Sequence, residues 1–353
     1  MSNLAIQQHL KRAVGDKSPI GRSVRRAYTK DGFLTFDQRT IDSAGSFLVG
    51  ELERLDQRLH EPLVSVTWAR DINLREDVSI ADEFSAFTNS SFAAASGIQG
   101  SNKAWIGKDS NAIVGVALDI GKTTTPLNLW AMQLGWTLPE LESAQKLGRP
   151  VDQQKFAAMQ LKYQMDIDEQ VYLGDTALSL AGLLNSSKVT NNTNALVGNW
   201  ATSTPAQILA DINEILKSAW AASGFAVCPT ELRIPPTQFT FLVATLISTA
   251  GNISILEFVR NNSICNAING TPLNIQPLKW LTGTTAGGVG PGAAGKDRML
   301  AYTNDPMRVR FPLVPIQRTP LEYRDLRQLT TYFGRLGAVE FVYPETIAYR
   351  DGI

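Results

Sequence analysis

The segment 150–173 limits most strongly what this chain can fold into, because its pattern predicts one long, uninterrupted helix. Pro150 is typical of a first helical turn, and Gly174 is typical of the residue after the last turn. Between them apolar side chains recur every three or four residues and therefore share one face: Phe156, Met159, Tyr163, Ile167 and Val171. Such a helix would be about 36 Å long. A rod of this length favours a spine on which other elements pack.

The rest of the chain predicts a mixed α+β fold. Capping patterns predict helices that begin after Thr137, Thr204 and Ser254, and Pro236 opens a further one. Runs of β-favouring residues predict the strands. These runs are 63–68, 113–118, 127–134, 231–234, 273–277, 299–303, 308–311 and two strands within 329–349. Between the first two runs lies a stretch of small and polar residues, 85–111, which we interpret as an extended hairpin or excursion with little core of its own.

The formal net charge is zero, because 33 basic residues balance 33 acidic ones. The molecule as a whole therefore lacks the strongly basic character of a nucleic-acid-binding protein. The first 30 residues are an exception, because Asp16 is their only acid while seven residues are basic. The basic residues are Lys11, Arg12, Lys17, Arg22, Arg25, Arg26 and Lys30. This segment is either a solvated tail or a contact with phosphate or an acidic protein surface. The N-terminus lacks the apolar run of a signal peptide, so we expect a soluble protein made in the cytosol.

Residues that could carry chemistry are few. Cys228 and Cys265 form no CxxC pair, and the two histidines, His9 and His60, are far from them in sequence. We therefore expect no structural zinc and no disulfide framework. Three acids near the end of the long helix, Asp166, Asp168 and Glu169, cannot converge on one ion, because residues two apart on a helix point in different directions. We interpret them as part of a solvated helix face.

The segment GPGAAGKD at 290–297 matches both GxxxxGK and GxGxxG, two patterns that cradle phosphate. A phosphate cradle needs a strand before it and a helix N-terminus after it. Here a glycine-rich stretch precedes the motif, and a strand-like run follows it. Asp297 also stands where a magnesium-binding Ser or Thr belongs. We therefore interpret 282–298 as a mobile glycine-rich loop, with a nucleotide-binding enzyme as the least favoured alternative.

Two segments resemble tailed-bacteriophage major capsid proteins of the Hong Kong 97 type and the related encapsulin shells. The first is DIDEQVYLGD at 166–175 followed by LAGLLN at 180–185, which resembles the exit of the spine helix in those proteins. The second is GAVEFVYPETIAYRDGI at 337–353, which resembles the glycine, strand, proline and short tail that complete their fold. The order of the predicted elements is also similar over nearly the whole chain.

The resemblance implies an α+β fold with four parts: an N-terminal arm at 1–62, an extended loop within 63–136, a peripheral domain at 137–198 with 322–343, and an axial domain at 199–321 with 344–353. It implies a non-enzymatic protein that assembles as hexamers and pentamers into an icosahedral shell around double-stranded DNA. It implies no cofactor, metal or membrane, and it implies decoration, scaffold and portal proteins as further partners. The shell would assemble in the bacterial cytoplasm and form the capsid of the virion. An encapsulin-like compartment with a cargo enzyme is the alternative.

Two sets of residues are candidates for contacts in such a shell. Trp105, flanked by Lys103 and Lys108, is a large aromatic residue within the small and polar stretch 85–111. It either packs back on its own hairpin or docks on an adjacent subunit as an aromatic anchor. The second set lies in the arm and would contact DNA or a partner: Lys11, Arg12, Arg22, Arg25 and Arg26.

Overall fold

The computed structural model describes residues 64–94, 108, 115–146, 151–189, 192–196, 198–247, 252–284 and 295–353. The chain divides into two units, 1–61 and 62–353, and every described residue lies in the second. The predicted N-terminal arm at 1–62 lies outside the described residues.

The first of two large sheets has six strands, in the order β1-β11-β13-β12, with β4 paired to β13 and β14 paired to β11. Only β1 and β11 run parallel within it. The strands are β1 (Asn73–Arg75), β4 (Asn128–Thr137), β11 (Val309–Arg318), β12 (Glu322–Arg324), β13 (Arg327–Leu336) and β14 (Glu340–Phe341). Strands β4 and β13 stay in register over their full length, from Asn128 opposite Leu336 to Thr137 opposite Arg327.

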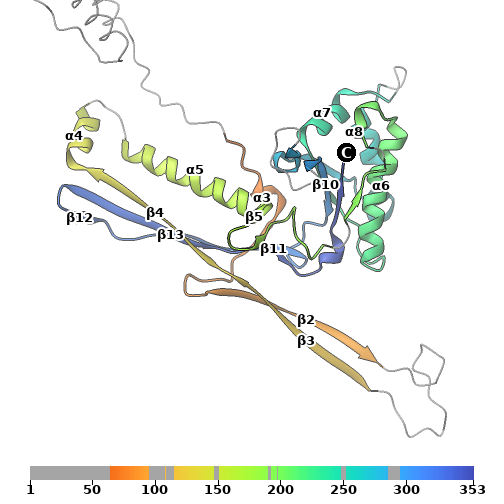
Figure 1. Ribbon diagram of the computed structural model, residues 1–353, viewed down its shortest axis with the longest axis horizontal. Coiled ribbons are helices and arrows are strands. Elements are labelled where there is room, and N and C mark those ends of the chain that lie inside the picture. The colour runs from red at the N-terminus through yellow and green to blue at the C-terminus, as the bar shows by residue number, and fades with distance from the viewer. Residues whose placement is uncertain are drawn as a thin grey trace, which may run out of the picture. The chain divides into compact units, whose positions relative to one another are not determined.

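The predicted long helix is confirmed as α5 (Val151–Tyr172), which lies along β4 and β13 (Figure 1). Its apolar stripe is buried from Met159 to Val171. Gly174 ends the helix with φ +71°, and a Cβ there would lie 2.2 Å from the carbonyl oxygen of Leu180. Only glycine fits this turn, because the short strands β5 (Gly174–Asp175) and β6 (Leu180–Ala181) pair directly after it. A shorter helix, α4 (Leu138–Lys146), precedes α5, and Thr137 Oγ1 accepts a hydrogen bond from the backbone N of Glu140.

The second sheet has five strands in the order β7-β15-β10-β8-β9, with helices packed against it. The strands are β7 (Asn192–Asn194), β8 (Glu231–Ile234), β9 (Asn274–Pro277), β10 (Arg298–Tyr302) and β15 (Ala348–Asp351). The helices are α6 (Pro205–Ala222), α7 (Pro236–Ala244), α8 (Ile255–Asn262) and α9 (Ile264–Asn269). The predicted caps are confirmed, since Thr204 forms a capping box with Gln207 and the Ser254 side chain accepts from the backbone N of Glu257.

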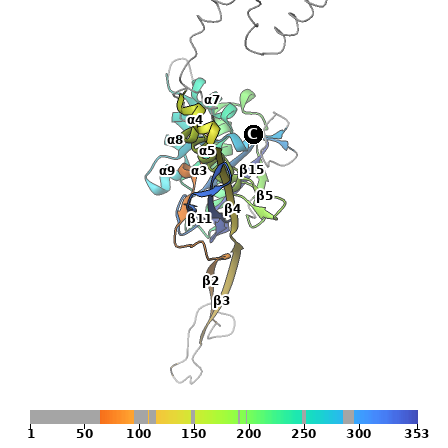
Figure 2. The same ribbon diagram turned by 90° about the vertical axis from the view of Figure 1, so that its left-hand side faces the viewer.

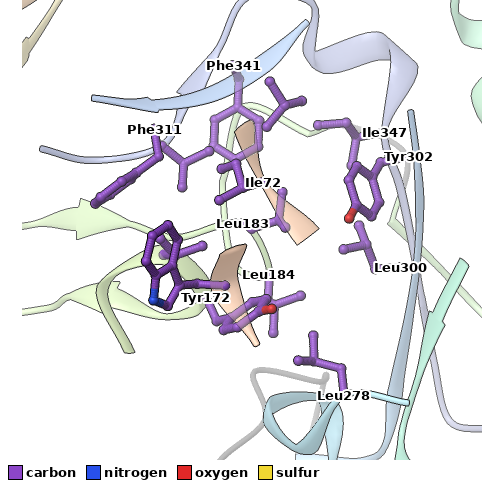
Figure 3. Close-up of a cluster of buried hydrophobic side chains, with 14 of the residues drawn as sticks. Ile72, Tyr172, Leu183, Leu184, Leu278, Leu300, Tyr302, Phe311, Phe341 and Ile347 are labelled. Carbon is purple, nitrogen blue, oxygen red and sulfur yellow. The ribbon is translucent and has the colours of Figure 1, made fainter. Parts of the chain in front are cut away.

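One buried cluster joins the two sheets (Figure 3). It takes side chains from the exit of α5, from the second sheet and from the first, and includes Tyr172, Leu183, Leu184, Leu300, Tyr302, Phe311 and Phe341. A second cluster packs α6 to α9 on the other side of the five-stranded sheet, with Trp200 and Ile212 among its buried members. The large apolar area removed from water in these clusters is the main driving force for this fold.

One expectation about the strands needs revision. The predicted strand at 63–68 is wrong: residues 64–67 are not in a strand, and α3 (Trp68–Asp71) begins at Trp68. The reason is tertiary, because Asp168 Oδ1 accepts hydrogen bonds from the backbone N of Thr67 at 2.8 Å and of Trp68 at 3.0 Å. Strand β11 lies within 199–321 and pairs with β13 of 322–343, so the six-stranded sheet contains strands from both ranges.

Candidate assembly surface

A long two-stranded hairpin extends away from both sheets (Figures 1 and 2). It consists of β2 (Phe84–Ala94) and β3 (Val116–Pro126), which pair antiparallel from Phe84 opposite Pro126 to Ala94 opposite Val116. The extended hairpin predicted from the polar stretch 85–111 is therefore confirmed. The strands continue beyond that stretch, because β3 reaches Pro126.

One face of β3 carries an exposed apolar stripe. Val116, Leu118 and Ile120 are 71%, 55% and 62% exposed. Alternate residues of a strand point to the same side, so these three side chains share one face of the ribbon. An isolated two-stranded hairpin is marginally stable in water, and contiguous exposed apolar side chains mark interaction surfaces. The stripe is therefore the best candidate for a surface that a second molecule covers.

This stripe was not predicted from the sequence. The predicted strand run ended at Leu118, whereas the alternation of apolar and other residues continues to Ile120 and a run of β-branched threonines follows at 123–125. Both are strand signals. A longer window on this alternation would have predicted the full strand and its apolar face.

A buried carboxylate fixes the root of the hairpin. Glu340 is fully buried, and its oxygens accept from Arg310 Nε at 2.7 Å, from Arg75 Nη1 at 3.1 Å and from the Ser85 hydroxyl. Arg75 Nη1 also donates to the carbonyl oxygen of Ala86 at 3.0 Å. The first residues of β2 are thus bonded to the first sheet through Arg75 of β1 and Glu340 of β14, and Arg310 of β11 binds the same Glu340 carboxylate.

Arg335 of β13 makes a second connection at the same root. Its guanidinium donates to the carbonyl oxygen of Ile80 at 2.8 Å and of Leu127 at 3.0 Å. Ile80 precedes β2 and Leu127 follows β3, so one side chain holds both ends of the hairpin. These charge-assisted bonds set the direction in which the hairpin leaves the sheet.

Of the residues predicted to make contacts, the structure describes only Lys108, which lies in an exposed turn. Trp105 and Lys103 lie outside the described residues. The predicted arm contacts, Lys11, Arg12, Arg22, Arg25 and Arg26, also lie outside them. Their roles remain predictions.

The glycine-rich segment has no phosphate-binding geometry at its described ends. Asp297 Oδ1 accepts from the backbone N of Gly283 at 2.7 Å, and its Oδ2 accepts from Gln238 Nε2 at 2.5 Å. The side chain that replaces a magnesium ligand in the motif therefore closes the base of the loop. The motif leads into strand β10 and not into a helix, so the helix that follows a phosphate cradle is replaced by a strand. Residues 285–294 lie outside the described part.

The acids of α5 do not form one solvated face, which corrects the sequence interpretation. Asp168 is buried, and besides the backbone N–H groups of Thr67 and Trp68 it accepts from Trp280 Nε1 at 2.6 Å. Asp166 is partly buried and accepts from Trp130 Nε1 at 2.9 Å. Glu169 is exposed. The helical pattern could not reveal the burial of Asp168, because its partners are about 100 residues distant in sequence.

The described residues offer little for metal or thiol chemistry. Within them no group of three or more His, Cys, Asp or Glu side chains could hold a metal ion. Cys228 and Cys265 are free and buried, and burial raises the pKa of the Cys228 thiol to about 11. Within the same residues, no helix has the length and apolar character that crossing a membrane requires.

Comparison with known protein families identifies the family of the chain that carries this exposed hairpin. A family described as major capsid protein matches residues 102–353, which is more than half of the chain. The chain belongs to the major capsid protein family. No curated protein matches it in sequence.

Solved structures with the same fold agree with this membership. The capsid of Myoviridae phage XM1 matches with a TM-score of 0.68 at 16% identity, over 86% of this chain and 97% of that chain. The capsid of a native GTA particle matches with a TM-score of 0.58 at 11% identity, over 88% and 97%. The structure of Mycobacterium phage Bobi matches with a TM-score of 0.55 at 12% identity, over 90% and 98%. This major capsid protein has the Hong Kong 97-type fold, as the sequence resemblance implied, and both its family and its fold are those of shell proteins and not of enzymes.

Proposed function

We propose that this major capsid protein builds the shell of a tailed bacteriophage, assembling as hexamers and pentamers into an icosahedral capsid that encloses double-stranded DNA. The observation that carries the proposal is the apolar stripe of Val116, Leu118 and Ile120, which the subunit itself leaves exposed. Burial of one such side chain stabilises by about 1.5–3 kcal/mol. Repeated at every interface of a shell, even a fraction of that free energy favours the assembled state.

The parts of the subunit follow from the resemblance and remain part of the proposal. The hairpin β2–β3 is the extended loop, and 1–62 is the arm. The first sheet with α5 is the peripheral domain, and it includes β11. The second sheet with α6 to α9 is the axial domain, which would surround the axis of each capsomer.

The packaged DNA is proposed to be held without sequence preference. The basic arm residues Lys11, Arg12, Arg22, Arg25 and Arg26 would neutralise phosphates on the inner surface of the shell. Decoration, scaffold and portal proteins are further proposed partners. Assembly is proposed to occur in the cytoplasm of the bacterial host, and the final location is the virion capsid.

Purified particles test the proposal directly. Expression of the full chain should give closed shells in electron micrographs, and particles from infected cells should show the absorbance ratio of DNA-filled shells. Protein-filled shells without DNA would favour an encapsulin-like compartment. A monodisperse monomer at high concentration would contradict the assignment.

A matched pair of variants tests the stripe. Leu118→Ser/Ile120→Ser should reduce the yield of shells at least tenfold, because two exposed apolar side chains lose their intermolecular burial. Ala117→Ser changes the opposite, exposed face of β3 and should assemble like the wild type. Equal yields from the two variants would remove the stripe from the assembly surface.

A further inference from the structure

Strand β9 forms a free edge of the five-stranded sheet, because within the described residues it pairs only with β8. The backbone of β9 alternates between the two sides of the strand. The backbone N of Asn274 and that of Leu278 donate to the carbonyl oxygens at either end of β8, at 3.0 and 2.8 Å, so the even-numbered residues face β8. The odd-numbered residues, Ile275 and Pro277, therefore direct their backbone groups outward.

Arginine side chains occupy both outward carbonyl groups of β9. Arg260 of α8 donates from Nη2 to the carbonyl oxygen of Ile275 at 3.1 Å. Arg70 of α3 donates from Nη2 to the carbonyl oxygen of Pro277, also at 3.1 Å. Pro277 itself has no N–H that could pair with another strand. Of the backbone groups that β9 directs outward, the two arginines and the proline therefore leave only the Ile275 N–H.

The surroundings of the two arginines fit a capping role. Arg70 is held in place by Asp71, which accepts from its Nε at 2.7 Å and from its Nη2 at 2.9 Å. Arg260 has a buried Nε, and this donor has no acceptor within the part of the chain that the structure describes. Burying an unpaired donor costs free energy, so the stability of the subunit alone does not account for an arginine at this position. The bond from its Nη2 to the edge of β9 does account for it.

An edge strand with open backbone groups is a template for pairing with a strand of another chain. We propose that Arg70 and Arg260 cap β9 and thereby prevent two copies of this capsid protein from pairing edge to edge before they assemble. Such pairing would be symmetric, with β9 of one copy against β9 of the other. It would join subunits through backbone hydrogen bonds in a contact that competes with assembly. The caps thus protect a chain that must meet many copies of itself.

Cross-linking of the dilute, unassembled full chain with a short bifunctional maleimide tests the proposal. Two paired β9 edges bring Gln276 of one copy close to Gln276 of the other, and the wild-type cysteines are buried, which keeps the background low. Arg260→Met/Gln276→Cys should give at least tenfold more covalent dimer than Gln276→Cys alone. Arg260→Lys/Gln276→Cys keeps a donor for the Ile275 carbonyl group and should give no more dimer than Gln276→Cys. The measurement uses unassembled chains, so its outcome is independent of shell formation.

A second cysteine position distinguishes edge pairing from general aggregation. Lys217 is an exposed residue of α6, and Arg260→Met/Lys217→Cys should give no more dimer than Lys217→Cys alone. The urea midpoint of Arg260→Met should equal that of the wild type, because the variant also removes the unpaired Nε. Equal increases in dimer at residues 276 and 217 would assign the effect to unfolding and overturn the proposal.

A proline substitution gives an independent test that leaves both arginines in place. Pro277→Ala adds an N–H on the outward side of β9, so Pro277→Ala/Gln276→Cys should give at least threefold more dimer than Gln276→Cys. Pro306 lies between β10 and β11, and Pro306→Ala/Gln276→Cys is the matched control that should leave the yield unchanged. If the folded variants among Arg260→Met and Pro277→Ala show no increase at residue 276, the proposal is wrong.

Discussion

Asp71 and Arg233 form a buried ion pair that connects the two halves of the subunit, with Asp71 Oδ1 2.8 Å from Arg233 Nε. Asp71 ends α3 beside the first sheet, and Arg233 lies in β8 of the second. Asp71 also accepts from Arg70 Nε at 2.7 Å and from the Tyr172 hydroxyl at 2.5 Å. One carboxylate therefore holds α3, α5 and the second sheet together.

Removing this charge should strongly destabilise the subunit. Asp71→Asn removes one of the two carboxylates that pair with the buried Arg233, the other being that of Glu231, and we expect the free energy of unfolding to fall by about 3 kcal/mol. Urea unfolding of the unassembled subunit measures the change. Asp77→Asn removes an exposed partner of Arg75 and should cost less than about 1 kcal/mol. Equal effects of the two variants would contradict the role of Asp71.

The same carboxyl should make the free energy of unfolding depend on pH in the acidic range. Burial alone would raise the pKa of Asp71, but the hydrogen bond from Arg70 and the charge of Arg233 outweigh it, so the pKa is lower than usual. A lowered pKa in the folded state means that the stabilisation is complete above the unfolded pKa of about 3.9 and is lost as pH falls below it. We expect the unfolding free energy to decrease below about pH 4, and to decrease less steeply in Asp71→Asn. Identical slopes for wild type and variant would exclude this contribution.

Two neighbouring acids of α5 should respond very differently to substitution. Asp168→Ala leaves the Trp280 indole and two backbone N–H groups without their acceptor, and we expect a loss of about 2–4 kcal/mol. Glu169→Ala, at an exposed position of the same helix, should change subunit stability by less than about 0.5 kcal/mol. Thermal unfolding of the unassembled subunit compares them.

Substitutions of the adjacent residues Lys296 and Asp297 should have different effects on the protein. Lys296→Ala is expected to leave assembly intact and to change no nucleotide affinity. Asp297→Ala should lower the melting temperature by several degrees, because it removes the acceptor that closes the loop at Gly283. Isothermal titration with ATP and a thermal scan test both, and nucleotide affinity that depends on Lys296 would revive the enzyme alternative.

Trp105→Ala should destabilise the shell much more than it destabilises the isolated subunit. We expect the unfolding of the isolated subunit to stay nearly unchanged, while the shell loses about 2–4 kcal/mol per copy, the range of an interface hot spot. Denaturant-induced disassembly and subunit unfolding are compared for wild type and variant. Equal destabilisation of both would show that Trp105 packs on its own hairpin.

Local patterns predicted the elements that local chemistry determines. The long helix ends two residues before Gly174, and the helices after Thr204 and Ser254 begin at their caps, because capping groups and a left-handed glycine act within a few residues. The strand at 231–234 is also confirmed. The sequence resemblance identified the fold, which the order of elements alone could only suggest.

Features determined by distant contacts were missed. The run at 63–68 favours a strand by composition. The backbone N–H groups of Thr67 and Trp68 instead donate hydrogen bonds to Asp168, and a helix begins at Trp68. The pairing of β11 with β13 also depends on tertiary structure.

The parallel pairing of β1 with β11 has a consequence for the time course of biogenesis. Asn73 lies opposite Arg310, so the first sheet cannot be completed until most of the polypeptide has been synthesised. Contacts this distant in sequence slow folding, and unfinished sheets expose edges that aggregate. Until then the hairpin that carries Val116, Leu118 and Ile120 lacks the completed sheet to which its base is bonded. The supply of capsid subunits should therefore be limited by how fast single chains fold, and chaperones that shield such chains should raise the yield of particles.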